Sequence, residues 1–166
     1  MYYLYVRPLL QYASYVWSPH LIKDIERLER VQRRFAKRLR GLSTLTYKDR
    51  LQVLGLQSLE SRRLQFNLIF AYKILTGRID INIKRLTSIF TLQSYQSTRG
   101  HGYKIYFPGC LTDARKFFFA LRVIHPWNSL KLTPTSMSSL RRFKALLRNA
   151  ESENRPDFYI TYYITY

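Results

Sequence analysis

Residues 30–40 carry the densest run of phosphate-binding groups in this chain. Six residues of the run are Lys or Arg and none is acidic. Arginine binds phosphate oxygens in a bidentate manner and also stacks on bases, so the run suits a nucleic-acid backbone. At 100° per residue, four of these cations share one side of a helix predicted over residues 21–40. We predict that these four contact nucleic acid; they are Arg30, Arg33, Arg34 and Lys37.

The other side of this predicted helix is apolar. Its members fall within one arc and are Leu21, Leu28, Val31, Phe35 and Leu39, with Ile25 at the edge. The first half of the helix mixes acids with cations, as an ordinary solvated face does, whereas the second half holds cations alone. We therefore expect one side to pack on the protein and the other to face a polyanion.

The whole chain is strongly basic. It has 28 Lys and Arg against 10 Asp and Glu, which gives a net charge of +18. Such an excess repels itself unless a counter-charge is bound. RNA, DNA or an RNA–DNA hybrid is the favoured partner, because neutralising phosphates releases condensed counterions. An anionic membrane is the alternative partner, but the basic helix lacks a Trp-rich insertion face. We expect no membrane and no small-molecule substrate.

Two further groups of cations are candidate phosphate contacts, one near the start of a helix predicted over residues 59–76 and one on the last predicted helix. They are Arg62, Arg63, Arg141, Arg142 and Lys144. The first pair opposes the helix dipole, which an approaching phosphate would relieve. Plain solvent exposure is the alternative for both groups. Trp17 and Trp127 could stack on bases, but their apolar neighbours favour core packing.

Groups for catalysis are missing from the sequence pattern. The closest carboxylate pairs, such as Asp24 with Glu26, are two residues apart and diverge on a helix. The histidines have no ligand neighbours at metal-binding spacing, and the glycines of residues 98–102 lack the lysine of a phosphate loop. We therefore predict no catalytic residue, no metal site and no cofactor in this chain.

The composition predicts a folded, mainly α protein. With 166 residues, 46% of them hydrophobic, the chain can bury a core. A single cysteine, Cys110, excludes an internal disulfide and indicates a reducing compartment. Arg7 and Pro8 interrupt the apolar N-terminus, so neither a signal peptide nor a membrane span is expected. We expect an intracellular protein, nuclear or cytoplasmic.

The predicted elements form a small helical bundle with an irregular or weakly β segment around residues 78–111. Thr46 and Ser58 are expected to cap helices that Gly55 and Gly77 end. The expected helices cover residues 2–16 (short and buried), 21–40, 46–54, 59–76 (the central core helix), 113–123 (stopped near Pro126) and a final stretch with Phe143 and Leu147 facing the core. A hairpin of residues 90–92 with 103–107 is possible in the irregular segment.

A series of different short sequence patterns follows in a defined order over residues 4–148. They include Arg7-Pro8-Leu9, Val16-Trp17-Ser18-Pro19, Leu28-Glu29-Arg30-Val31-Gln32-Arg33-Arg34, Leu54-Gly55-Leu56, Tyr72-Lys73-Ile74-Leu75, Thr98-Arg99-Gly100-His101 and Trp127-Asn128-Ser129-Leu130. In this order they resemble the C-terminal part of the reverse transcriptases of non-LTR retrotransposons of the jockey and CR1 kind, the region that follows the polymerase palm. Gln11 and Gln57 depart from that pattern, and the tail from about residue 151 matches nothing in it.

The resemblance implies a fragment of an RNA-directed DNA polymerase. Residues 1–77 would form a thumb-like helical bundle, 78–111 a connector, and 112–149 C-terminal helices packing on the bundle. The tail of residues 150–166 alternates like a strand beyond the last predicted helix, so it is expected to be disordered or an aggregation-prone edge. Such a thumb clamps template and primer by phosphate contacts, while Mg²⁺ belongs to the palm, which is missing here together with the fingers. The chain alone is therefore predicted to be inactive. A stand-alone basic RNA-binding protein of ribosomal type and a basic helical membrane-surface protein are the alternatives.

Overall fold

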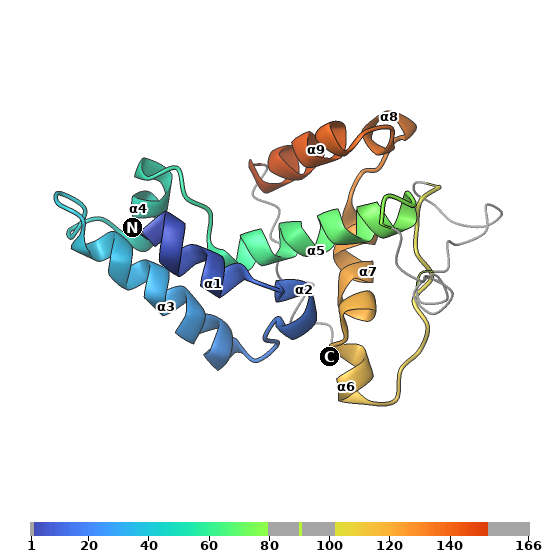
Figure 1. The fold of residues 1–166 in the computed structure, drawn as a ribbon, viewed down its shortest axis with the longest axis horizontal. Coiled ribbons are helices and arrows are strands. Elements are labelled where there is room, and N and C mark those ends of the chain that lie inside the picture. The colour runs from blue at the N-terminus through green and yellow to red at the C-terminus, as the bar shows by residue number, and fades with distance from the viewer. Residues whose placement is uncertain (1, 80–89, 91–101, 153–166) are drawn as a thin grey trace. The chain divides into compact units, whose positions relative to one another are not determined.

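The computed structural model describes residues 2–79, 90 and 102–152, and it is mainly helical, as predicted (Figure 1). The chain forms two compact units, Met1–Phe66 and Asn67–Tyr166. The boundary between the two units falls inside the helix Leu59–Leu75, whereas the sequence analysis predicted that the first domain ends at residue 77. The loop at 98–101, most of the possible hairpin and the tail from 153 lie outside the described residues.

Unit 1 contains the basic helix. Its elements are η1 (a π-helix, Tyr2–Val6), α1 (Arg7–Gln11), α2 (Ser14–Trp17), α3 (Ile22–Arg38), α4 (Tyr47–Val53) and the first part of α5 (Leu59–Leu75). The α3 helix is the predicted basic helix, and it ends two residues earlier than expected, because Leu39 has extended backbone angles.

Two predicted helix caps are confirmed. The backbone N–H of Asp49 donates to Thr46 Oγ1 at 3.3 Å, and the Thr46 hydroxyl donates to Asp49 Oδ2 at 2.6 Å. Ser58 Oγ accepts from the backbone N–H of Ser61 at 3.1 Å. The bonds from Asp49 and Ser61 each satisfy an N–H group that the first turn of a helix leaves without a backbone partner.

Gly77 ends α5 as predicted. Its φ of +64° is the left-handed conformation that glycine adopts without a steric penalty. The N–H of Arg78 reaches the carbonyl of Lys73 at 2.9 Å, and the N–H of Gly77 reaches that of Ile74 at 3.1 Å. This pair of bonds is the Schellman arrangement.

The predicted central core helix is confirmed in α5. None of its residues is exposed, and Leu59, Leu68, Ala71 and Tyr72 are wholly buried. A helix that is apolar on several sides must be buried on several sides, which is why this element could be identified from composition alone.

The N-terminal segment differs from its prediction as one buried helix. The chain breaks at Ala13, whose φ is +48°, and only Tyr2 and Ser14 of the segment are buried. Leu9 and Tyr12 are more than three-quarters exposed. The segment is apolar on all sides but contacts α3 through one side, so most of its apolar surface stays uncovered.

Polar side chains hold the N-terminal segment on α3. The Tyr2 ring stacks on Phe35 at a centroid distance of 4.2 Å, and its hydroxyl donates to Gln32 Oε1 at 2.7 Å. The Gln32 amide in turn donates to the carbonyl of Gln57 at 2.8 Å. A fully satisfied buried amide thus joins three segments of unit 1.

Alkaline pH is expected to destabilise unit 1 through Tyr2. Burial disfavours the phenolate and raises the pKa of Tyr2 to about 12. In the unfolded chain, Tyr2 ionises near pH 10. The stability gained by burying its neutral hydroxyl is therefore fully present below about pH 10 and is lost as the pH rises to about 12. The corresponding loss in the free energy of unfolding is on the order of 2 kcal/mol. Urea unfolding at about pH 8 and about pH 11 should therefore show a smaller alkaline loss for Tyr2→Phe than for the exposed control Tyr12→Phe. Equal losses would contradict this.

Unit 2 contains the remaining helices: the rest of α5, α6 (Asp113–Lys116), α7 (Phe119–Ser129), α8 (Pro134–Met137) and α9 (Leu140–Ser152). Residues 113–123 were predicted as one helix that stops near Pro126. Instead two helices form, and α7 continues through Pro126. A proline inside a helix costs about 3 kcal/mol, and here burial of the whole Trp127 side chain offsets it.

Residues 102–111 are irregular, as predicted, with a single β-bridge residue, Ile105. Asn128 binds both backbone polar groups of this residue. Its Oδ1 accepts from the N–H of Ile105 and its Nδ2 donates to the carbonyl of Ile105, both at 2.9 Å. Trp127 Nε1 donates to the carbonyl of Tyr103 at 2.8 Å. These bonds anchor the irregular segment to the end of α7.

Candidate nucleic-acid interface

The α3 helix has a buried stripe and an opposite cationic face. Ile25, Glu29, Gln32 and Ala36 form the stripe and are buried. The cationic face comprises the exposed residues Lys23, Arg27, Arg30, Arg33, Arg34, Lys37 and Arg38. At 100° per residue all of these cations except Arg33 lie on the side away from the stripe, and Arg33 lies at the edge of the face next to Glu29. The helix therefore presents its charge to solvent on a backbone fixed by packing.

Acids offset little of this charge. Asp24 pairs with Arg27 at 3.2 Å, Glu29 is buried, and the exposed Glu26 lies among the cations of the face. Arg33 lies over the ring of Tyr47, with its guanidinium carbon 5.0 Å from the centroid. All four residues predicted as primary contacts are exposed together on this face.

The packing side of α3 differs from the predicted apolar arc. Val31 and Leu21 are 39% and 45% exposed, and Leu28, Phe35 and Leu39 are half-buried. Only Ile25, which was placed at the edge, is buried. The true stripe is rotated toward Glu29 and Gln32. A count of apolar residues misses such a stripe, because two of its members are polar.

Glu29 was not singled out by the sequence analysis, and it organises unit 1. Its carboxylate accepts from the backbone N–H of Leu59 at 3.0 Å and from the hydroxyl of Tyr47. It thereby caps the N-terminus of α5, where the helix dipole favours negative charge. Burial and the hydrogen bond to Glu29 raise the pKa of Tyr47. The sequence signal that could have identified Glu29 is its spacing of four residues from Ile25, which places both residues on one side of the helix.

Arg62 and Arg63 do not stand at the surface as predicted phosphate contacts would. Arg63 is 3% exposed. Arg62 is half-buried, lies over the ring of Phe66 at 5.3 Å, and donates to Gln57 Oε1 at 3.5 Å. The carboxylate of Glu29 occupies the N-terminus of α5, where the sequence analysis expected a phosphate to approach.

The cations predicted on the last helix are exposed in unit 2. Arg141, Arg142 and Lys144 lie on α9 away from the buried side chains of Phe143 and Leu147. The sequence pattern thus correctly predicted which side of α9 is exposed and which side is buried. These three residues belong to a separate unit from the cationic face of α3.

The two tryptophans have opposite surroundings. Trp127 is wholly buried, as the core interpretation predicted. Trp17 is 41% exposed, so its predicted core packing is wrong. Its indole N–H donates to the carbonyl of Tyr12 at 2.5 Å, which fixes the ring at the surface.

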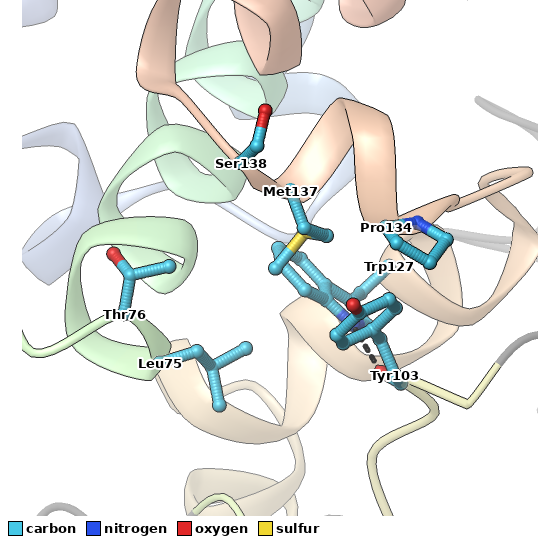
Figure 2. Close-up of a pocket in the computed structure, with 7 residues that line it drawn as sticks. All are labelled: Leu75, Thr76, Tyr103, Trp127, Pro134, Met137 and Ser138. Atoms are coloured by element: carbon cyan, nitrogen blue, oxygen red, sulfur yellow. Dashed lines mark hydrogen bonds between the residues drawn. The ribbon is translucent and has the colours of Figure 1, made fainter.

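A pocket of about 280 Å³ lies in unit 2 (Figure 2). Its lining is mostly apolar and consists of Leu75, Thr76, Tyr103, Trp127, Pro134, Met137 and Ser138. The hydroxyls of Thr76 and Ser138 donate to the backbone carbonyls of Tyr72 and Thr135. Among the described residues of this lining, no base lies beside either hydroxyl.

Among the described residues, no group of three or more His, Cys, Asp or Glu side chains could hold a metal ion. None of the helices in the same residues has the length and apolar character needed to cross a membrane.

The chain was compared with protein-family models, with curated proteins and with solved structures, and none of them matches it. The resemblance to reverse transcriptases therefore rests on the sequence patterns given above. What the geometry adds is a cationic helix face with a fixed backbone.

Proposed function

We propose that this chain binds nucleic acid without sequence preference, through phosphate contacts made by the cationic face of α3. The observation that carries the proposal is the exposure of seven cations on a helix that packs on the rest of unit 1 through a buried stripe. A rigid row of this kind suits a sugar-phosphate backbone, since phosphate contacts set position and orientation and carry no sequence information.

The dimensions support several simultaneous contacts. The 17 residues of α3 span about 25 Å at 1.5 Å per residue. Double-stranded nucleic acid carries a phosphate charge about every 1.7 Å of its axis. Five of the seven cations are arginines, which can each grip a phosphate with two N–H groups.

The biological setting that we propose is the thumb region of a non-LTR retrotransposon reverse transcriptase. The ordered patterns of residues 4–148 support it, as do the helical fold and the cationic face. In a full-length element the palm would carry Mg²⁺ and the chemistry, and this region would hold template and primer. Palm-like sequence upstream of the Met1 codon in the genome would support this setting.

Binding to an RNA–DNA hybrid should be strongly salt-dependent and indifferent to sequence. Each neutralised phosphate adds about 0.9 to the negative slope of log K against log salt, so several contacts give a steep slope. Fluorescence anisotropy with two unrelated hybrid sequences, between about 50 and 200 mM salt, measures both properties. A flat slope, or an affinity that depends on sequence, would refute the proposal.

A further inference from the structure

Among the described residues, Arg33 is the one cation of the α3 face that lies over an aromatic ring. Its guanidinium carbon is 5.0 Å from the centre of the Tyr47 ring, which belongs to α4. Arg30 and Arg34 are also exposed, but in the described part of the chain they have no ring contact, hydrogen bond or ion pair. We propose that Arg33 is the principal phosphate contact of the cationic face and that Tyr47 is the residue that positions it. This inference rests on the proposed function.

The Tyr47 ring is fixed within unit 1. Its hydroxyl donates to the carboxylate of Glu29, which also accepts from the backbone N–H of Leu59. The ring is half-buried, and Thr46 caps the helix that carries it. Tyr47 thus joins α3, α4 and the start of α5, and Arg33 lies over a ring that these bonds hold in place.

The ring contact does not use the hydrogen-bonding capacity of Arg33. The ring quadrupole attracts the positive charge, whereas a phosphate is bound by the N–H donors in the guanidinium plane. The side chain is exposed, and no acceptor among the described residues bonds to it. Glu29 lies four residues earlier on α3, but its carboxylate bonds to Tyr47 and Leu59. The donors of Arg33 are therefore available to grip one phosphate in the bidentate manner.

A side chain that is ordered before binding has an advantage over its neighbours. Immobilising a long side chain at an interface lowers the affinity by a factor of about 2 to 12. Arg30 and Arg34 are subject to this loss when they meet a phosphate. The contact with Tyr47 already restricts Arg33 in the free protein, so Arg33 avoids part of the loss and should contribute more to the affinity.

A second cation lies beside the same ring. The guanidinium carbon of Arg50 is 5.9 Å from the centre of the Tyr47 ring, and the Arg50 side chain is 6% exposed. Its Nη1 has no hydrogen-bond partner and it forms no ion pair among the described residues. Two cations beside one ring repel each other, and a phosphate bound at Arg33 would offset this repulsion.

A purely structural link between α3 and α4 is the competing role for the contact of Arg33 with Tyr47. The two helices are already joined by the hydrogen bond of Tyr47 to Glu29. A cation that lies over a ring at an exposed site adds little to stability. We therefore favour phosphate binding, and the test includes the structural role.

The test replaces one arginine at a time with lysine, which keeps the positive charge and loses the planar guanidinium. Fluorescence anisotropy with an RNA–DNA hybrid measures Arg33→Lys beside the matched controls Arg30→Lys and Arg34→Lys. Arg33→Lys should weaken binding at least about threefold more than either control, because only Arg33 is ordered by a ring. The salt slope should stay unchanged in all three variants, since each keeps its charge.

Two results would overturn the role of Arg33. One is an equal loss of affinity in the three lysine variants, and the other is an Arg33→Lys variant that binds like the unchanged chain. In both cases a steep salt slope would still support the proposed function. Absence of hybrid binding by the unchanged chain would overturn the proposed function itself.

A double-variant comparison tests whether Tyr47 acts through Arg33. Tyr47→Leu should weaken hybrid binding about as much as Arg33→Lys does, and the combined variant should bind no more weakly than either. Tyr47→Phe keeps the ring and should retain the affinity, although it loses the bond to Glu29. Equal losses from Tyr47→Leu with and without Arg33 would overturn the positioning role in favour of a structural one. Circular dichroism checks folding, and the lysine series at exposed positions decides the role of Arg33 independently of Tyr47→Leu.

Discussion

Replacing Glu29 with alanine is expected to lower the free energy of unfolding of unit 1 by about 2–4 kcal/mol. The change removes the cap on the buried backbone N–H of Leu59 and leaves the half-buried hydroxyl of Tyr47 without its acceptor. A lost helix cap costs about 1 kcal/mol, and an unsatisfied buried polar group costs about 1–3 kcal/mol more. Urea unfolding followed by circular dichroism measures the effect.

Glu26→Ala is the matched control for this prediction. It removes the same charge from the same helix, but Glu26 is exposed. Its effect should stay within about 0.5 kcal/mol, as is usual for surface changes. Similar losses in the two variants would show that the network around Glu29 contributes nothing to stability. Glu29→Gln keeps an acceptor and should fall between them.

The sequence predicted helices well wherever local chemistry decides their limits. Thr46 and Ser58 cap helices as expected, and Gly77 ends α5 with a positive φ. These signals depend on a few neighbouring residues and need no knowledge of the tertiary contacts. The exposed cations of α3 and α9 were predicted for a related reason, since charged side chains without partners stay in water.

Burial could not be predicted where polar groups form the core. Glu29 and Gln32 lie at the centre of unit 1 because their partners come from α4, α5 and η1, segments distant in sequence. Helical periodicity cannot show such partners. For the same reason Arg63 was predicted at the surface, although it is buried. The apolar composition of the N-terminal segment predicted burial, but the rest of unit 1 does not cover this segment.

The cationic face of α3 is the centre of this account, and removing its charge should have the largest effect on binding. The combined variant Arg30→Gln, Arg33→Gln, Arg34→Gln and Lys37→Gln keeps good helix formers, and all four side chains are exposed. Its fold should therefore survive. If all four contact phosphate, the salt slope should shrink by about 3.6, at about 0.9 per phosphate.

A charge-matched variant distinguishes the effect of removing this face from the effect of lowering the net positive charge of the chain. This control replaces four other exposed cations with Gln and so removes as much positive charge. They are Lys48, Arg78, Arg115 and Lys131. The most direct measurement is the hybrid affinity and salt slope of both variants beside the unchanged chain. The α3 variant should lose most of the affinity and slope while its helicity is retained, and the matched variant should lose little. Equal losses in the two variants, or an α3 variant that binds like the unchanged chain, would contradict phosphate binding by this face.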